Sequence, residues 1–101
     1  MGPLTYSPPM TGSVPGAPRA RVRQLDIDGE ITLYDGEHST AVVLNATASD
    51  VWRLLDGRRS TDEIVRLLSG AYNTPPDTVR IDVERTLREL ADRHLLDDAM
   101  A

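Results

Sequence analysis

Apolar and polar residues alternate along residues 21–44, a period typical of strands that bury one face. Two Asp-Gly pairs, Asp28-Gly29 and Asp35-Gly36, interrupt the alternation and favour tight hairpin turns, because glycine adopts a positive φ angle without steric cost. The pattern predicts three antiparallel strands over about residues 21–27, 30–35 and 39–44. In a simple meander the third strand lies at an edge of the sheet, where one side of its main chain has no partner.

After the strands, the apolar positions recur every three or four residues, the period of an amphipathic helix. A first helix is predicted over about 47–56, and either Asn45 or Thr47 can cap its start. Ser60 followed by Glu63 forms a capping box that opens a second helix. Thr74 is the predicted N-cap of a third helix, which is expected to end near Arg93.

Three strands followed by three helices predict an α+β fold of the winged helix-turn-helix kind, in which the last two helices form the helix-turn-helix pair. Residues 1–20 hold five of the seven prolines and three of the seven glycines and show no hydrophobic period. They are therefore predicted to form a flexible tail. The folded domain is expected over residues 21–97, with residues 98–101 as a short C-terminal tail.

An acidic composition without cysteine narrows the functions open to the chain. Its net charge of −5 and a third helix with five acidic residues against four arginines argue against nucleic-acid binding, which needs a basic face. The absence of cysteine excludes disulfides and thiolate chemistry. No apolar run reaches the length of about 18 residues that a membrane span requires. We therefore predict a cytoplasmic protein that binds neither nucleic acid nor membrane.

Candidate catalytic and metal-ligating residues form no recognisable constellation in the sequence. The serines lack a His–Asp arrangement, and nucleophilic catalysis needs a base within hydrogen-bond reach. His38 and His94 lie in a predicted turn and near a predicted helix end, without cysteine or a second histidine at ligand spacing. We therefore predict that the chain is not an enzyme and holds no metal or cofactor.

Short motifs in a fixed order cover most of residues 22–96. They are Leu44-Asn45-x-Thr47-Ala48, Val51-Trp52, Leu54-Leu55-Asp56-Gly57, Arg59-Ser60, Glu63-Ile64-Val65, Tyr72, Pro75-Pro76, Asp82-Val83 and Leu95-Leu96. In this order they resemble the PqqD-like family, whose members are also described as recognition elements for RiPPs, the ribosomally made peptides that enzymes later modify. Each motif is short, but their combination is specific.

The resemblance implies a small peptide chaperone without catalysis of its own. Such domains bind the leader region of a precursor peptide and present the peptide to a maturation enzyme, such as a radical SAM protein or a leader peptidase. The leader is implied to add as a strand beside the third strand, in a groove walled by the third helix. An exposed edge strand next to an amphipathic helix also suits strand addition on physical grounds.

Mapped onto this chain, the expected peptide-binding residues come from the third strand and from the third helix outside its core stripe. They are Ser39, Thr40, Ala41, Val42, Val43, Leu44, Arg80, Glu84, Arg85, Leu87, Arg88 and Ala91. Thr40, Val42 and Leu44 are predicted to face the core. We further hypothesise that arginines on one flank of the helix, Arg80 and Arg88, pair with acidic leader side chains.

Several alternatives remain open at this point. The peptide could belong to a quinone-cofactor (PQQ-type) pathway or to a lasso-type pathway. A winged-helix regulator that binds DNA is the alternative from another class of protein. A homodimer built through the open edge, and an N-terminal tail that occupies the peptide groove, are further alternatives.

Overall fold

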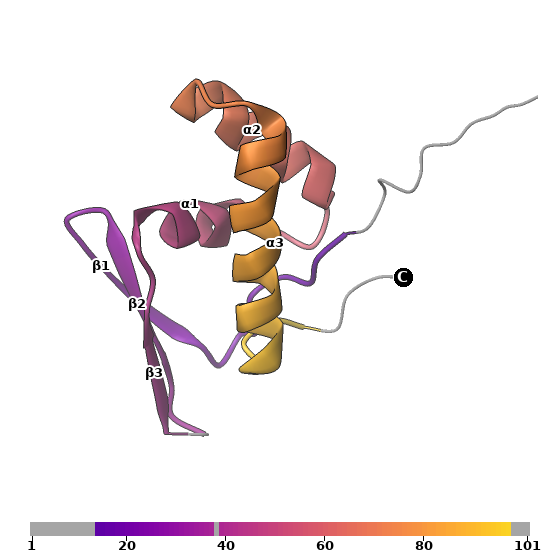
Figure 1. The fold of residues 1–101 in the computed structure, drawn as a ribbon. Helices are drawn as coiled ribbons and strands as arrows, with labels where there is room; N and C mark the ends of the chain where they lie inside the picture. The colour runs from indigo at the N-terminus through magenta and orange to yellow at the C-terminus, as the bar shows by residue number, and fades with distance from the viewer. Residues whose placement is uncertain (1–13, 38, 98–101) are drawn as a thin grey trace, which may run out of the picture.

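Three antiparallel strands form a meander that is followed by three helices, which confirms the predicted α+β order (Figure 1). The computed structural model describes residues 14–37 and 39–97. The strands pair in the order β1-β2-β3, so β3 lies at an edge. The bounds are β1 (Arg23–Ile27), β2 (Glu30–Asp35), β3 (Thr40–Val43), α1 (Ala46–Leu54), α2 (Thr61–Tyr72) and α3 (Pro76–Asp92).

The register of the sheet determines which strand residues face the helices. Leu33 of β2 pairs with Val42 of β3, and Leu33 is fully buried while Val42 packs partly buried against the core. Ala41 and Val43 lie on the opposite, solvent-exposed face, and 72% of Val43 is accessible. Leu44, just after the strand, is buried. The predicted alternation along the third strand is therefore confirmed.

The hydrophobic core lies between the inner face of the sheet and the three helices. α1 packs against β2 and against both other helices, and α2 packs along α3. Trp52 of α1 is buried, and its indole Nε1 donates a 2.9 Å hydrogen bond to Oε1 of Gln24 in β1. The rest of the core is aliphatic, as expected for a chain without phenylalanine.

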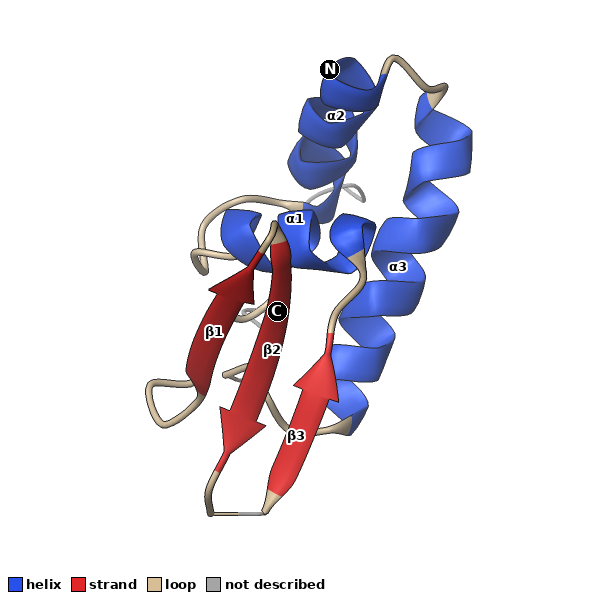
Figure 2. Cartoon of the chain, turned by 90° about the vertical axis from the view of Figure 1, so that its left-hand side faces the viewer, coloured by secondary structure: helices blue, strands red, loops and turns tan. Residues whose placement is uncertain are grey.

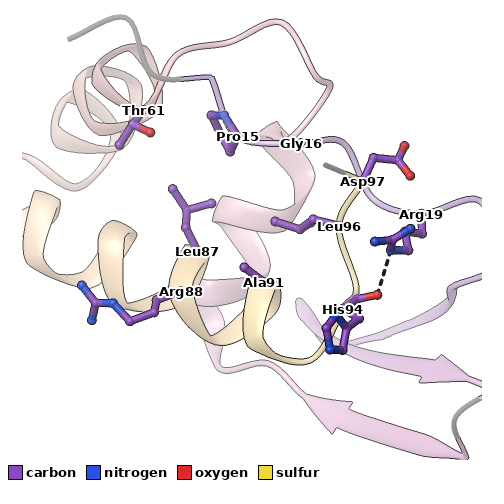
Figure 3. A pocket seen from close by; sticks show the side chains of 10 residues that line it. All are labelled: Pro15, Gly16, Arg19, Thr61, Leu87, Arg88, Ala91, His94, Leu96 and Asp97. Carbon is purple, nitrogen blue, oxygen red and sulfur yellow. Dashed lines mark hydrogen bonds between the residues drawn. The ribbon is translucent and has the colours of Figure 1, made fainter. Parts of the chain in front are cut away.

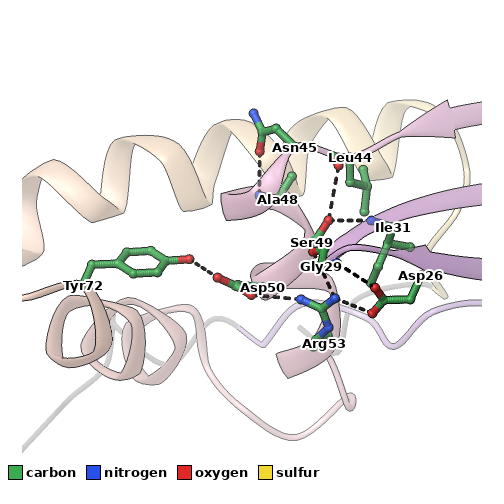
Figure 4. Close-up of polar contacts among 10 residues, drawn as sticks. All are labelled: Asp26, Gly29, Ile31, Leu44, Asn45, Ala48, Ser49, Asp50, Arg53 and Tyr72. Atoms are coloured by element: carbon green, nitrogen blue, oxygen red, sulfur yellow. Dashed lines mark hydrogen bonds and ion pairs between the residues drawn. The ribbon is translucent and has the colours of Figure 1, made fainter.

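A buried serine joins α1 to the sheet at the end of β3. Oγ of Ser49 accepts a 2.9 Å hydrogen bond from the amide of Ile31 and donates a 3.3 Å bond to the carbonyl of Leu44 (Figure 4). The amide of Leu44 donates to the carbonyl of Ile31 at 2.8 Å. The hydroxyl therefore bridges the paired residues Ile31 and Leu44. Because Ser49 belongs to α1, this bridge holds the end of β3 against that helix.

Two helix caps agree with the sequence and one does not. The side chains of Asn45 and Ser60 accept hydrogen bonds from main-chain amides at the starts of α1 and α2. α3 instead begins after Pro75, which makes no side-chain cap. The hydroxyl of Thr74 donates to the carbonyl of Tyr72 at the end of α2, so the predicted Thr74 N-cap is wrong.

Residues 14–20, which we call the strap, pack against the C-terminal end of the domain. The amide of Asp97 donates to the carbonyl of Ala17 at 2.7 Å, and the amide of Arg19 donates to the carbonyl of Leu95 at 3.0 Å. Pro18 and Leu96 form an antiparallel bridge. The strap is thus packed, although the sequence assigned residues 1–20 to the flexible tail. The sequence does not reveal this packing, because pairing through the main chain needs no hydrophobic period. Residues 1–13 and 98–101 of the predicted tails lie outside the described residues.

Gly16→Ala is expected to lower the free energy of unfolding by about 1 kcal/mol, the low end of overpacking costs. A Cβ at this position would lie 1.8 Å from the carbonyl oxygen of Asp97, so the strap must move away. Urea unfolding followed by circular dichroism measures the change. Gly70→Ala is the matched control, because its added Cβ meets nothing within 4 Å. An unchanged midpoint for Gly16→Ala would show that the strap does not stabilise the domain.

Candidate functional site

β3 lies at the open edge of the sheet, and α3 runs alongside it (Figure 2). Side chains of both elements line a groove between them. The groove holds a cavity of about 160 Å³. Its lining consists of Val42, Val43, Leu44, Asn45, Ala48, Thr86, Glu89, Leu90 and Arg93.

Within residues 14–37 and 39–97, β3 pairs with β2 alone, so every second residue of β3 directs its main-chain groups to the open edge. Antiparallel ladders alternate between residues that hydrogen-bond to the neighbouring strand and residues whose groups point the other way. Leu44 hydrogen-bonds to β2, and the register places Val42 and Thr40 in the same set. The N–H and C=O groups of Ala41 and Val43 therefore point to the open edge, where a further strand can pair with them.

The two walls of the groove differ in chemistry. The strand side and the floor are apolar, and Leu44, Ala48 and Leu90 are buried there. The helix side is polar and presents Glu89 and Arg93. An extended peptide in the groove would therefore bury apolar side chains on the floor and place polar ones against α3.

A second hollow of about 240 Å³ lies beside the start of α1 and the first half of α3. It shares no lining residue with the groove, although Asn45 and Ala46 are neighbours in the chain and Asp82 and Thr86 lie one turn apart on α3. Six of its eight lining residues carry a hydroxyl or a carboxylate: the lining is Ala46, Thr47, Asp50, Tyr72, Thr74, Thr78, Val79 and Asp82.

Polar contacts connect this hollow to the sheet (Figure 4). The hydroxyl of Tyr72 donates to the carboxylate of Asp50, which also pairs with Arg53 at 2.9 Å. Arg53 in turn pairs with Asp26 at 2.5 Å and donates to the carbonyl of Gly29 at 3.1 Å. The hydrogen bond from Arg53 holds the pKa of the Asp26 carboxyl below its usual value. The contacts tie α2, α1 and the β1–β2 turn together.

Tyr72 is expected to titrate well above an ordinary tyrosine. Burial, together with its hydrogen bond to Asp50, raises its pKa to about 12. Because this exceeds the unfolded value of about 10, the neutral phenol stabilises the fold below pH 10, and this contribution is lost as the pH rises toward 12. Ultraviolet absorbance of tyrosinate measures the titration, and Tyr72→Phe should remove the late transition. A single transition near pH 10 for all tyrosines would contradict the expectation.

Of the predicted strand residues, Val42, Val43 and Leu44 line the groove, whereas none of the predicted helix residues does. Ser39 adjoins β3, and Thr40 to Leu44 follow along the open edge. Arg85 is exposed beside the groove and pairs with Asp82 at 3.3 Å. Arg80 points to α2, where it pairs with Asp62 at 2.7 Å, and it lies 3.9 Å from Glu84.

The other predicted helix residues, Leu87, Arg88 and Ala91, line a back cavity on the far flank of α3 (Figure 3). This cavity has a volume of about 380 Å³. Its remaining lining comes from the strap, α2 and the C-terminal segment: Pro15, Gly16, Arg19, Thr61, His94, Leu96 and Asp97. The structure therefore separates these three residues from β3.

The residues that α3 presents to β3 were not singled out from the sequence. They are Thr86, Glu89, Leu90 and Arg93. Periodicity identifies the buried stripe of α3, but the two flanks of that stripe are equivalent until the position of β3 is known. The sequence shows which residues lie beside the buried stripe, but it does not show which side of the stripe faces β3.

The described residues contain neither a membrane-spanning helix nor a cluster of metal ligands. Within the described residues, the helices are too short or too polar to cross a bilayer. The same residues contain no group of three histidine, cysteine or acidic side chains that could hold a metal ion. His94 is exposed just after α3, where its amide donates to the carbonyl of Ala91, and His38 lies outside the described residues.

The fold and the groove define a winged helix-turn-helix-like domain with an open strand edge. Residues 30–96 match the family model described as "Coenzyme PQQ synthesis protein D (PqqD)". The chain belongs to this family, which confirms the resemblance seen in the sequence.

A curated relative and two solved structures are similar to this chain. The relative, the "PqqA binding protein" of Gluconobacter oxydans (strain 621H), is 36% identical over 56 residues, which are 55% of this chain and 58% of that protein. The match thus covers less than two thirds of the relative's length. "TbiB1 in Complex with the TbiA(beta) Leader Peptide" gives a TM-score of 0.74 at 31% identity, over 84% of this chain and 99% of that one.

The second structure is the solution NMR structure of the PqqD truncation of Methylobacterium extorquens PqqCD. It is described as a functional and stand-alone RiPP recognition element. It gives a TM-score of 0.68 at 28% identity and covers 84% of this chain and 89% of that one. Both solved structures therefore share the α+β fold described above.

Proposed function

We propose that this chain binds the leader region of a ribosomally synthesised precursor peptide as an added strand on β3. The observation that carries the proposal is the open edge of β3, where the main-chain groups of Ala41 and Val43 face a groove with an apolar floor and a polar helix wall. Membership of the PqqD family supports it. So does the similarity to a structure named for its complex with a leader peptide.

In this function the main chain and the groove have different tasks. Hydrogen bonds to Ala41 and Val43 supply affinity that does not depend on the peptide's side chains, whereas the groove selects among side chains. The bound leader extends the sheet by one strand and leaves the rest of the precursor free for a separate maturation enzyme. The chain itself is proposed to catalyse nothing. Because the peptide is made on ribosomes, the complex would form in the cytoplasm.

The family suggests which of the two pathways to favour. The family description names PQQ synthesis, and the curated relative is named for binding PqqA. We therefore favour a PQQ-type pathway, in which the partner is a radical SAM enzyme, over a lasso-type pathway with a leader peptidase. The DNA-binding alternative is not favoured, because α3 carries more acidic residues than arginines and nucleic-acid affinity depends on phosphate contacts with basic groups.

Fluorescence anisotropy with a labelled leader peptide tests the proposal. The peptide is taken from the precursor gene beside the gene for this chain, and a scrambled peptide of equal length serves as the control. We expect saturable binding of the leader and not of the scrambled peptide. Binding of a DNA duplex at low salt, together with no binding of the leader, would overturn the proposal in favour of a transcriptional regulator.

The stoichiometry of the complex is a separate proposal. A homodimer through the open edge would use the same β3 groups that the leader needs, so the two states should exclude each other. Light scattering on the free chain and on the leader complex measures both masses. We propose one chain per leader, and a dimeric complex with both edges closed would contradict this arrangement.

A further inference from the structure

Glu89 in the last turn of α3 and Arg93, the C-cap residue of that helix, are charged side chains that line the groove beside β3. Neither side chain makes a hydrogen bond or ion pair within residues 14–37 and 39–97. Glu followed by a basic residue four positions later is a spacing that favours pairing on a helix. The two side chains nevertheless remain available to a bound ligand.

Their spacing matches that of an added strand. Residues four apart on a helix are separated by about 6 Å along its axis. Two residues of a strand that point to the same face are separated by about 6.6 Å. α3 runs alongside the edge strand in Figure 2, so side chains i and i+2 of a peptide can meet Glu89 and Arg93 together.

The direction of the peptide sets the order of its charges. α3 runs opposite to β3, because β3 leads up to α1 while α3 descends from the α2–α3 turn (Figure 2). A strand that pairs antiparallel with β3, as its neighbour β2 does, therefore runs in the same direction as α3. Such a peptide reaches Glu89 before Arg93.

The position of Glu89 on its own helix is unfavourable. It lies in the last turn of α3, where the negative end of the helix dipole disfavours a carboxylate, and the cation at the C-cap, Arg93, makes no ion pair with it. A residue that breaks a local rule without a compensating contact often serves a function. A ligand cation beside Glu89 would supply the missing compensation.

We propose that Glu89 and Arg93 select leaders by charge order, with a lysine or arginine followed two residues later by an aspartate or glutamate on the face toward α3. This inference rests on the proposed function and adds the class of peptide that the groove accepts. The ion pairs that the peptide would form with Glu89 and with Arg93 are partly exposed, and together they are expected to raise the affinity for the peptide about tenfold.

Display selection tests the inference without knowledge of the natural leader. A phage library of random nine-residue peptides is selected against the wild-type chain and against Glu89→Arg/Arg93→Glu, and binders that also bind Ala41→Pro are discarded. We expect basic-x-acidic peptides from the wild type and acidic-x-basic peptides from the double variant. Exchanging the two charges of a selected peptide should weaken its binding to the wild type about tenfold at low salt.

The outcomes separate the inference from the proposed function. Edge-dependent peptides without a common charge order, or with the same order on both proteins, would overturn the inference and leave leader binding intact. An acidic-x-basic order on the wild type would also overturn it, because the strand would then run parallel to β3. A selection that yields no edge-dependent peptide would count against both. Glu89→Gln should keep or raise the melting temperature of the domain while it weakens binding of the selected peptides. A purely structural role for Glu89 would instead lower the melting temperature.

Discussion

Ala41→Pro is expected to lower the affinity for the leader peptide at least about tenfold while the domain stays folded. The amide of Ala41 points to the open edge, so proline removes a donor that only an added strand would use. Proline is tolerated in edge strands where the N–H group would face solvent. In the complex, a peptide carbonyl would lose its partner and stay desolvated, which costs about 1–3 kcal/mol.

The affinity is measured by anisotropy with the labelled leader, and folding by circular dichroism and thermal unfolding. Ala41→Ser is the matched control, because it keeps the amide and adds a polar atom on the exposed face. Wild-type affinity in Ala41→Pro, with the fold retained, would mean that the peptide does not pair with β3.

Ser49→Ala is expected to lower the free energy of unfolding by about 1–3 kcal/mol. The Ser49 side chain is fully buried and serves both the amide of Ile31 and the carbonyl of Leu44. Alanine leaves both groups without this bridge in a site that water does not reach. Because the bridge also fixes the exit of β3, the groove should become wider or more mobile.

Urea unfolding measures the stability change. Thr78→Ala, an exposed hydroxyl deletion on α3, is the control and should stay within about 0.5 kcal/mol of the wild type. A loss for Ser49→Ala no greater than that of the control would mean that the two main-chain groups find each other directly. In that case the hydroxyl would not be needed to close the ladder.

Local patterns in the sequence were sufficient to predict the elements of the fold. Alternation and the two Asp-Gly pairs located the strands, and the capping signals before the first two helices located those helices, because each of these features acts within a few residues. Of the two pairs, only Asp28-Gly29 has positive φ angles, and after β2 the positive φ angle falls on Ser39 instead. The edge position of β3 followed from the meander, since three strands joined by tight turns leave the third one open.

Contacts between distant segments could not be predicted in the same way. The rotation of α3 about its axis decides whether Glu89 and Arg93 or Arg80 and Arg88 face β3, and that rotation is set by packing against α1 and α2. The strap was placed in a tail because main-chain bonds to residues 95–97 leave no pattern of side chains. Thr74 failed as a cap because α3 begins one residue later, after Pro75, and the Thr74 hydroxyl instead donates to the carbonyl of Tyr72 at the end of α2.

Amide hydrogen exchange, followed by NMR with and without the leader peptide, is the most direct test of strand addition on β3. The amides of Ala41 and Val43 face the open edge, whereas the register directs those of Thr40 and Val42 to β2. We predict that saturating leader slows exchange at Ala41 and Val43 and changes Thr40 and Val42 much less. Binding that leaves Ala41 and Val43 unprotected, with changes confined to the back cavity around Leu87, Arg88 and Ala91, would contradict the account.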